Sequence, residues 1–532
     1  MNPAWRRREV LVLPGLLLLA AALRLPDLAT RGTWDADQGH DMLMLRALVR
    51  DGVIPLLGPP TSIGDVHHGA LYYFLLAPAA ALTGGDSPLA VVAWIALAGI
   101  AAVGVTWWLA RSIAGPVAGL VAGLAMAISP AAIDESTFIW NPNPIALSSA
   151  VALAGAWRAW TTRRPAWWLV AAVGTAVTMQ CHVLGVTLLP VIGALLVADV
   201  RRRAVATERR ALIRVGLGGL AIVALSFLPL VIHELTTDFS EVQAALAYLR
   251  AGGDVPTLGP VPRFLVVASR VVSWPLVGLI TDGLVAAVVA ILGVLALASW
   301  RFVAATGPER TAVRWLTLGL AWTALALTMI SPSLAAVVEG LPNDHYHAFA
   351  DPMVFVLVGI GAAALWRAGD RAIAGAGAGM PAAATPGRVL AGVGLVAVVA
   401  WAMTHQPPAV APDGGFPAAE RAAARIEADI TVDPIGLGSL PVFKTAEAYQ
   451  YPLVRDGRIV EIARMSDGAP VAGSNLVVVC DSLFEAAIGA PCGGPAEAVA
   501  SAQGYGAPFD RFQAAPRQTI SIYRAPQGSG AP

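Results

Sequence analysis

The sequence predicts an all-α polytopic membrane protein with about eleven transmembrane helices, followed by a small α/β domain at the C-terminus. Of its 532 residues, 57% are hydrophobic and 13% are charged, whereas a soluble globular protein has about 25% charged residues. Apolar segments recur along the chain up to about residue 404. This composition excludes a soluble enzyme. The formal net charge of +0 excludes a general nucleic-acid-binding surface, which would be basic.

A helix that crosses a bilayer needs about 20 mainly apolar residues. The first such segment follows Arg6–Arg8 and resembles a signal peptide, but the many segments after it favour a membrane anchor that is retained. The segments expected to cross the membrane are 10–26, 89–110, 115–132, 144–160, 166–181, 183–200, 211–231, 278–299, 314–331, 351–366 and 388–404.

The arginines predict the orientation of these helices, because short cytoplasmic loops are enriched in basic residues. Arg6–Arg8 put the N-terminus in the cytoplasm. With eleven crossings the later clusters also fall inside, at Arg111, Arg163–Arg164, Arg201–Arg203, Arg209–Arg210, Arg310, Arg367 and Arg371. The apolar stretch 69–83 would reverse this pattern if it crossed, and it is short for a span. We expect it to form an interfacial or re-entrant helix on the outer face of the cell membrane.

The segment 405–532 is expected to form an extracytoplasmic domain, joined to the transmembrane domain 1–404 by a linker rich in Pro and Gly. A helix is predicted at 419–430, and strands are predicted at 475–482 and 518–524. The outer loops that precede this domain are expected at 27–88, 131–143, 232–277 and 332–350.

The three cysteines are too few for a disulfide scaffold. Cys480 and Cys492 both lie in the C-terminal domain, where an oxidising outer side of the membrane would let them pair. Sequence does not supply the geometry that a disulfide requires, so the pairing stays open at this point. Cys181 stands alone in a membrane segment and is expected to be inert core.

Acidic residues are concentrated in the first outer loop, just after the first membrane segment. Asp35, Asp37, His40 and Asp41 fall within seven positions, and helical spacing puts Asp37 and Asp41 on one face. An N-terminal helix cap explains one of these acids, but it does not explain three acids beside a histidine. We expect catalytic work from Asp37, Asp35 or Asp41, and substrate contact from His40.

Two adjacent histidines, His67 and His68, precede the apolar stretch that contains Tyr72 and Tyr73. Imidazole N–H groups at the bilayer surface suit contact with a lipid phosphate or pyrophosphate. The same histidines could be metal ligands or, together with the tyrosines, part of an ordinary interfacial belt. We count His67, His68 and Tyr72 among the candidate substrate-binding residues.

The second outer loop carries Asp134 and Glu135 close to Trp140, Asn141 and Asn143. Aromatic faces and amide groups commonly hold sugars, so these residues are also candidates for substrate binding. A Pro/Asn turn followed by a helix start explains Asn141 equally well, but it does not explain the two acids.

Further histidines follow the same pattern. His182 lies at a tight outer turn, and His345, Tyr346 and His347 precede a late membrane segment. Helix ends collect polar groups, so each position alone says little. Because most of the eight histidines fall on one side of the membrane, we expect a common polar cavity at that face.

These positions resemble motifs of the GT-C class of membrane glycosyltransferases. The likeness is to the family 39-like branch, which contains protein O-mannosyltransferases and the aminoarabinose transferase of lipid A, and it covers about residues 5–404. Members commonly have an Asp-Glu pair in the first outer loop, where this chain has Asp37-Gln38. They commonly have Lys-Pro-Pro-Leu-Tyr-Tyr where this chain has HGALYY from His68, and a basic-Tyr pair where it has His345-Tyr346.

The resemblance implies a GT-C-like fold and an inverting transfer of a sugar from a polyprenyl-phosphate-linked donor to an acceptor hydroxyl. It implies that Asp37 is the general base, and it puts His68 and His345 where relatives contact the lipid phosphate. A carboxylate does this work best when desolvation raises its pKa toward the working pH. Histidine in place of lysine or arginine would make the phosphate contacts pH-sensitive, and Gln38 alters the acid pair.

Other functions stay open on the sequence alone. A ligase that uses a lipid-pyrophosphate donor would also place Arg and His in outer loops. A transporter or flippase is favoured by internal repeats and polar residues at mid-membrane, and neither is evident. No cofactor is predicted with certainty, although Asp35, Asp37, Asp134 and Glu135 could assemble ligands for a divalent metal. The expected partners are the lipid-linked donor, the bilayer and a protein, lipid or polysaccharide acceptor, and no nucleic acid.

Overall fold

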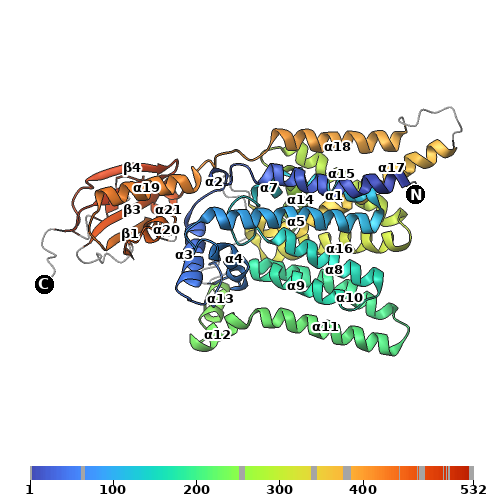
Figure 1. The fold of residues 1–532 in the computed structure, drawn as a ribbon, viewed down its shortest axis with the longest axis horizontal. Helices are drawn as coiled ribbons and strands as arrows, with labels where there is room; N and C mark the ends of the chain where they lie inside the picture. Colours follow the sequence, from blue (N-terminus) through green and yellow to red (C-terminus); the bar gives the residue numbers. More distant parts are fainter. Residues whose placement is uncertain are drawn as a thin grey trace.

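The protein consists of a bundle of long helices and a smaller α/β domain packed beside one end of that bundle (Figure 1). The structure is a computed structural model. It describes residues 3–61, 66–250, 258–336, 344–375, 385–442, 444–463, 465, 474–494, 497, 498, 500 and 504–526, except for the side chains of residues 3–10, 332 and 371–375.

Each of the eleven segments expected to cross the membrane is helical, so their secondary structure is confirmed. The caps follow local chemistry: α5, α6 and α18 begin with Pro in the first turn, where the missing N–H costs nothing. The helices are α1 (Pro3–Arg24), α5 (Pro88–Ala114), α6 (Pro116–Ile128), α8 (Ile145–Thr162), α9 (Trp167–Cys181), α10 (Leu188–Arg202), α11 (Ala206–Ser226), α15 (Leu284–Ala304), α16 (Gly307–Ile330), α17 (Asp351–Gly375) and α18 (Pro386–Thr404).

The protein is a multi-pass membrane protein, but the number of spans stays a prediction. In the described part of the chain, six helices are long and apolar enough to cross a membrane. They become seven if α11 and α12 (Leu228–Thr236), which are bent by 46°, form one broken span. Four further apolar helices are shorter: Leu11–Arg24 of α1, α4 (Leu71–Ala81), α6 and α9.

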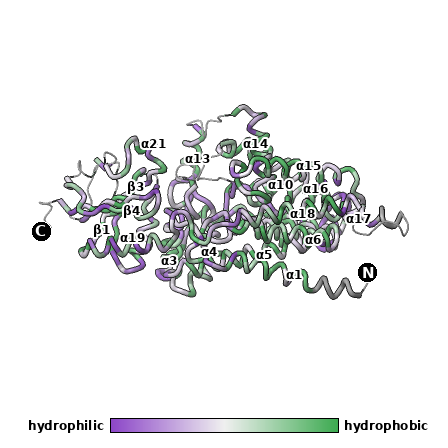
Figure 2. The backbone as a smooth tube through the Cα atoms, turned by 90° about the horizontal axis from the view of Figure 1, so that it is seen from above, coloured by the Kyte–Doolittle hydropathy of each residue, from purple (hydrophilic) through white to green (hydrophobic). Residues whose placement is uncertain are grey.

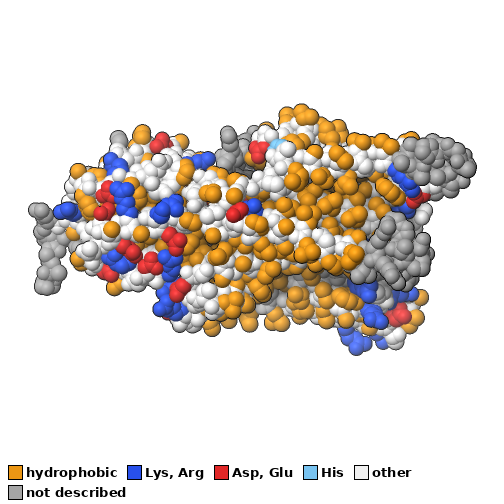
Figure 3. Space-filling view, turned by 45° about the horizontal axis from the view of Figure 1, so that its top comes forward, with side chains coloured by type: hydrophobic (Ala, Val, Ile, Leu, Met, Phe, Trp, Pro, Cys, Tyr) orange, Lys and Arg blue, Asp and Glu red, His pale blue; other side chains and the backbone are white. Residues whose placement is uncertain are grey.

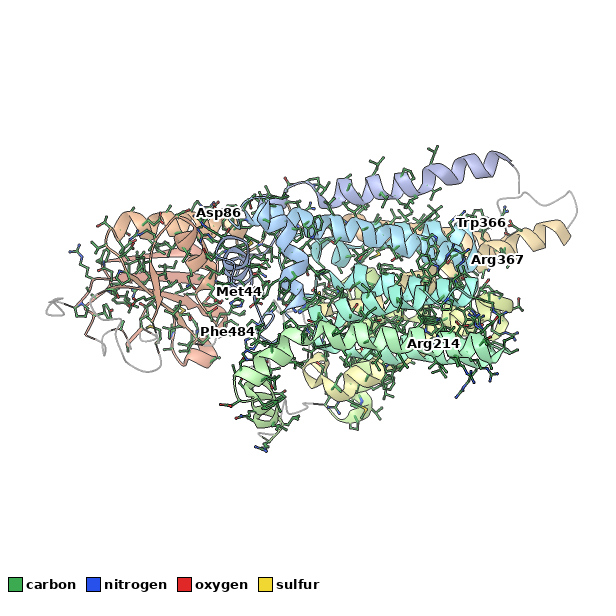
Figure 4. All side chains as sticks on the ribbon, turned by 60° about the horizontal axis from the view of Figure 1, so that its bottom comes forward. Met44, Asp86, Arg214, Trp366, Arg367 and Phe484 are labelled. Atoms are coloured by element: carbon green, nitrogen blue, oxygen red, sulfur yellow. A yellow bond between two sulfur atoms is a disulfide. The ribbon has the colours of Figure 1, made fainter. Side chains whose placement is uncertain are left out.

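The two ends of the bundle differ in charge. An orange apolar belt separates basic side chains at the far end from mixed charges near the α/β domain (Figure 3). Arg214 and Arg367 lie at the far end, whereas Asp86 lies next to the α/β domain (Figure 4). This distribution agrees with the expected alternation of short basic loops. Which end of the bundle faces the cytoplasm stays a prediction. The side chains of Arg6–Arg8 and Arg371, which were part of the predicted basic pattern, lie outside the described residues.

Short helices fill the connections at the end that faces the α/β domain. The α4 helix has 11 residues, about 16 Å at 1.5 Å per residue, which is far short of the roughly 30 Å hydrocarbon core. The other connecting elements are α2 (Leu28–Arg31), α3 (Ala36–Arg50), α7 (Pro130–Asp134), η1 (Val183–Thr187), α12, α13 (Ser240–Arg250), α14 (Pro260–Val277), η2 (Pro332–Ala335) and η3 (Asp344–Ala350). The sequence had not indicated α14, which packs against α7, η2 and η3.

Close packing of α8 and α9 fixes the loops at their ends. A Cβ added at Gly174 would lie 2.6 Å from backbone atoms of α8, and one added at Gly155 would lie 2.8 Å from the backbone of α9. Small residues allow membrane helices this close an approach. The loop before α8 is tied to the end of α9, because Asn141 Nδ2 donates to the Cys181 carbonyl at 2.6 Å.

The C-terminal part is a small α/β domain, as predicted. Its five-stranded sheet has the order β2-β1-β3-β5-β4, with β1 parallel to β2 and β3, and β5 antiparallel to β3 and β4. Cys480 on β3 and Cys492 form a disulfide. The elements are α19 (Gly415–Asp429), β1 (Ile435–Leu440), α20 (Glu447–Arg455), β2 (Val460–Ile462), β3 (Asn475–Asp481), η5 (Ser482–Phe484), α21 (Glu485–Ile488), β4 (Asp510–Ala515) and β5 (Gln518–Tyr523).

Hydropathy separates the two parts of the molecule. In Figure 2 the tube is green along α5, α15 and α16, whereas purple and white segments dominate α3 and the C-terminal domain. The polar connecting helices therefore lie between the membrane-embedded bundle and the C-terminal domain, where a site open to both can form.

Candidate active site

The site begins at the N-terminus of α3, which the sequence caps reciprocally. The Asp35 side chain accepts from the backbone at the first turn, while the backbone N–H of Asp35 donates to Gln38 Oε1 at 2.8 Å. Gln38 Nε2 also donates to the Ile139 carbonyl at 2.9 Å. A glutamate at this position could accept the hydrogen bond from the Asp35 backbone, but it could not donate one to the Ile139 carbonyl. Gln38 therefore ties α3 to the second outer loop. Asp35 therefore caps the N-terminus of α3, which is the structural role that the sequence allowed for one of the three acids.

Asp37 occupies the first turn of the same helix and is accessible to solvent. Protein groups nevertheless surround its carboxylate, and the resulting desolvation raises the pKa of Asp37 above its ordinary value. Lys444 and His40 oppose this rise, Asp35 adds to it, and Trp140 lies within hydrogen-bonding reach of the carboxylate. An accessible carboxylate with a raised pKa has the properties of a general base.

The C-terminal domain supplies two residues to this site. The Lys444 ammonium forms an ion pair with Asp35, and Glu447 Oε1 lies 2.8 Å from His40 Nδ1. Burial alone would lower the pKa of His40, but the hydrogen bond and charge of Glu447 outweigh it, so the pKa is raised. Both contacts depend on close packing, because a Cβ on Gly39 would lie 2.1 Å from the Glu447 carbonyl oxygen.

A row of aromatic and imidazole rings extends from Asp37 into the membrane domain. Neighbouring ring centroids are 3.7 Å apart for Trp140–His345, 4.3 Å for His345–Tyr346, 4.6 Å for Tyr346–His182 and 4.8 Å for His182–His68. Four separate segments of the chain contribute to this row. The common polar site that the outer histidines predicted therefore brings together His68, Trp140, His182, His345 and Tyr346.

His68 lies at the far end of the ring row and is 7% exposed. Within the described part of the chain its Nδ1 atom has no hydrogen-bond partner. Burial, followed by the effect of His67, lowers the pKa of His68 to about 3, so the ring is neutral at physiological pH. Its unpaired nitrogen makes it a candidate for contact with a ligand, because buried polar atoms are normally satisfied.

Asp41 and Tyr72 lie on the buried side of α3. The Tyr72 and Tyr73 hydroxyls donate to Asp41 at 2.7 and 3.1 Å, and all three side chains are buried. Burial raises the pKa of Asp41 to about 7. These contacts join α3 to α4, so Asp41 and Tyr72 belong to the support of the site rather than to its accessible surface.

Three other candidates also make contacts within the protein. His67 lies with its Nδ1 atom 2.9 Å from Glu241 Oε1 on α13, and its backbone N–H donates to the same carboxylate. Asn143 Nδ2 donates to the Phe138 carbonyl at 2.7 Å. Like Asn141, Asn143 shapes the loop around Trp140, as the alternative interpretation of a turn had suggested.

Glu135 and Asp344 lie in a separate buried cluster. Trp274 Nε1 donates to Glu135 Oε1 at 3.2 Å, whereas Asp134 is exposed. Asp344 accepts two hydrogen bonds from Arg270 on α14, at 2.8 and 2.6 Å, and His347 Nε2 lies 3.3 Å from the same carboxylate. His347 is thus held beside an ion pair. In the described residues no group of three or more His, Cys, Asp or Glu side chains has a geometry that could hold a metal ion.

Sequence reasoning did not indicate Lys444, Glu447, Arg270 or Trp274. Lys444 is the only lysine in the chain, and this is the one signal that could have singled it out. Arg270 sits in an apolar stretch, where a lone charge normally has a specific partner. No local pattern links either residue to its acidic partner, because each pair joins segments far apart in the sequence.

Comparisons with known proteins agree with this architecture. Residues 67–231, which include His68, Trp140 and His182, match the family model described as dolichyl-phosphate-mannose-protein mannosyltransferase. No curated protein matches the chain in sequence.

Solved structures show the fold. The apo structure of ArnT from Cupriavidus metallidurans is similar over 99% of this chain and 100% of that chain, with a TM-score of 0.58 and 13% identity. The same protein bound to undecaprenyl phosphate has a TM-score of 0.57 and 13% identity, over 100% of both chains. The Archaeoglobus fulgidus oligosaccharyltransferase, in complex with Zn and sulfate, has a TM-score of 0.53 and 14% identity, over 97% of this chain and 73% of that chain.

The expected resemblance to the GT-C glycosyltransferases is confirmed, and the chain has their fold. The sequence resemblance stopped near residue 404, but the likeness to ArnT covers almost the whole chain and so includes the C-terminal domain. The structural relationship therefore does not end at the linker.

Proposed function

We propose that the protein is a membrane glycosyltransferase that transfers a sugar from a polyprenyl-phosphate-linked donor to an acceptor hydroxyl. One observation carries the proposal: the accessible carboxylate of Asp37 stands at one end of a ring row whose other end is the buried His68, and within the described residues the Nδ1 atom of His68 has no hydrogen-bond partner. A base and an anion contact beside the same aromatic surface suit the sugar and the phosphate of a lipid-linked donor.

Asp37 is the group proposed to activate the acceptor. Its carboxylate accepts the hydroxyl proton while the acceptor oxygen forms a bond to the anomeric carbon of the sugar. The bond between that carbon and the phosphate oxygen breaks at the same time, and the polyprenyl phosphate leaves with the bonding electron pair. Attack from the face opposite the leaving group inverts the anomeric centre. General-base catalysis of this kind contributes about 100- to 10,000-fold to a rate.

His68 is proposed to contact the phosphate, and Trp140 is proposed to present its face to the sugar. A neutral imidazole can donate one hydrogen bond to a phosphate oxygen. An anion placed beside His68 would raise the pKa of its imidazole from this low value, because opposite charges favour the charged form. Contact with the donor would thus strengthen as the ring takes up a proton.

The position of the ring row suits a lipid-linked substrate. His182 follows α9 directly and Trp140 precedes α8, so the row lies at the ends of membrane helices. A phosphate bound there would leave the isoprenoid chain in the bilayer. ArnT has been captured with undecaprenyl phosphate, and a lipid phosphate of this class is the donor carrier proposed here.

The site is proposed to face the extracytoplasmic side of the cell membrane, with the N-terminus in the cytoplasm. The Cys480–Cys492 disulfide supports this orientation, because disulfides persist in oxidising compartments. The acceptor is a hydroxyl of a protein, a lipid or a polysaccharide that reaches the site from the same side.

The purified full-length protein should be offered a panel of radiolabelled polyprenyl-phosphate pentoses and hexoses. Each donor is incubated with membrane lipid, cell-wall polysaccharide or envelope protein as the acceptor. We expect one donor to be consumed, with its label transferred and polyprenyl phosphate released. Consumption of a polyprenyl-pyrophosphate glycan in place of every monophosphate donor would overturn the assignment in favour of a ligase.

A further inference from the structure

The chain contains one lysine, and that lysine lies beside the proposed base. All other basic side chains apart from histidine are arginines, yet Lys444 occupies the position that contacts the start of α3. The lysine ammonium is a compact charge on a flexible stem. A point charge can neutralise one acid and still act electrostatically on its neighbour.

Lys444 acts on two carboxylates of the first outer loop. Its ammonium pairs with Asp35, and it is close enough to Asp37 to influence that group as well. A second contact from the same domain reaches Asp35, because Gln518 Nε2 donates to Asp35 Oδ1 at 3.3 Å. Asp481 at the end of β3 also faces the lysine. The ammonium is therefore held between acids of both domains.

The docking of the C-terminal domain is fixed at several points around Lys444. Trp34 Nε1 donates to the Ala448 carbonyl at 2.9 Å, and the backbone N–H of Trp34 donates to Asp413 Oδ2 at 2.9 Å. From the same face of α20, the Tyr451 hydroxyl donates to the Gly85 carbonyl at 3.0 Å. These contacts hold α20, which begins three residues after Lys444, against the first outer loop, so the position of the lysine relative to α3 is defined.

We propose that Lys444 is a positioning residue for Asp37, supplied by the C-terminal domain to neutralise Asp35 and keep Asp37 available as the free carboxylate. This inference rests on the proposed function of Asp37. It assigns the C-terminal domain a part in the chemistry without placing any of its residues on the reacting atoms. An undocked domain would leave Asp35 and Asp37 as two unneutralised acids at one helix terminus.

The charged and polar groups around Asp37 are consistent with this role of Lys444. Desolvation and Asp35 raise its pKa, whereas Lys444 and His40 lower it and Trp140 approaches from the second outer loop. Lys444 has the largest lowering effect on Asp37. Removing this charge would therefore push the pKa of Asp37 further up, and more of the base would be protonated at a given pH.

The activity test compares K444Q and K444R with the wild-type protein, using the donor identified in the panel. Loss of an opposite charge within a few Å shifts a carboxylate by about one pKa unit or more. We expect the acid limb of kcat/KM for K444Q to move to higher pH by that amount, with activity regained in alkaline buffer. K444R should keep the wild-type limb. The control R425Q removes a domain cation that pairs with Asp510 instead.

A second measurement does not depend on turnover. Reductive methylation with 13C-formaldehyde labels only Lys444 and the N-terminal amine, because the chain has no other lysine. We expect the Lys444 methyl resonance, identified by its loss in K444R, to titrate with the neighbouring carboxylates and to lose that response in D35N and D37N. The size-exclusion profile and the thermal unfolding midpoint of each variant verify that it is folded.

The outcomes separate the two proposals. A lysine resonance that ignores D35N and D37N, or a K444Q protein with the wild-type pH profile, would overturn the positioning role. A uniform loss of activity at every pH would show a merely structural contact and would overturn it as well. If the resonance responds as expected but no lipid-phosphate donor is consumed, the proposed function fails and the Lys444 contact with the acids stands.

Discussion

The indole of Trp140 lies against the imidazole of His345, with ring centroids 3.7 Å apart. Trp140 comes from the loop before α8 and His345 from the turn before α17. Their contact joins the neighbourhood of Asp37 to the histidines at the membrane helices, because Trp140 also lies within hydrogen-bonding reach of Asp37. Without it the carboxylate and the ring row would be two separate features.

Replacing Trp140 by Ala should therefore weaken donor binding and misplace the sugar. Loss of one aromatic partner and its packing is expected to lower kcat/KM by about 10- to 100-fold, mostly through a higher KM. Steady-state transfer with the identified donor measures this. The matched control is W366A, because Trp366 lies at the opposite end of the bundle (Figure 4). Equal losses in both variants would contradict the assignment.

The buried Asp41 should make stability depend on pH. Its folded-state pKa is raised to about 7, so the folded protein holds this proton while the unfolded chain, with an ordinary carboxyl, has released it. Stability should fall as pH rises from about 4 to about 7, by about 1.4 kcal/mol for each unit of pKa difference. Thermal unfolding of wild-type and D41N across this range measures the slope. D41N should flatten it, and D51N, at the exposed end of α3, should not.

Gly39 should be essential for docking of the C-terminal domain. A Cβ at this position would overlap the Glu447 carbonyl oxygen at 2.1 Å, and neither backbone can move without separating α3 from α20. We expect G39A to lose at least 10-fold in kcat/KM and to expose the linker near residue 410 to limited proteolysis. The control G193A adds a methyl group where nothing lies within 4 Å. Protection of the linker in G39A would contradict this contact.

The disulfide gives a direct test of compartment. Protein purified without reductant should show one thiol after denaturation, from Cys181, and three after reduction. The Cys480→Ser, Cys492→Ser double variant should lower the stability of the C-terminal domain by about 3 kcal/mol, as expected for a short closed loop. Three thiols in the untreated protein would contradict an oxidising location for this domain.

The sequence predicted the parts of the molecule that are encoded locally. Apolar runs indicated the eleven helices of the bundle, and the valine-rich run within residues 475–482 indicated β3. The acidic start of α3 indicated a helix cap, and this cap occurs at Asp35. The functional role that the same residues indicated for Asp37 stays a prediction. β1 was not predicted, because Gly436 and Gly438 lower its strand propensity.

The parts that could not be predicted are contacts between distant segments. Nothing near Asp35 specifies Lys444, and nothing near Asp344 specifies Arg270, because each ion pair forms only when the helices and the C-terminal domain have packed. For the same reason the sequence grouped Asp41 with Asp37, although one points into the α3–α4 contact and the other into the accessible site.

The central claim is that Asp37 is the base, and the most direct measurement is the single-turnover rate of transfer by D37N, with D51N as the matched control. The account predicts a loss of about 100-fold or more in D37N with normal membrane insertion and donor binding, and a wild-type rate in D51N. The wild-type rate should fall on the acid side at a pH above the ordinary carboxyl pKa, because the pKa of Asp37 is raised. Wild-type turnover in D37N would contradict the account.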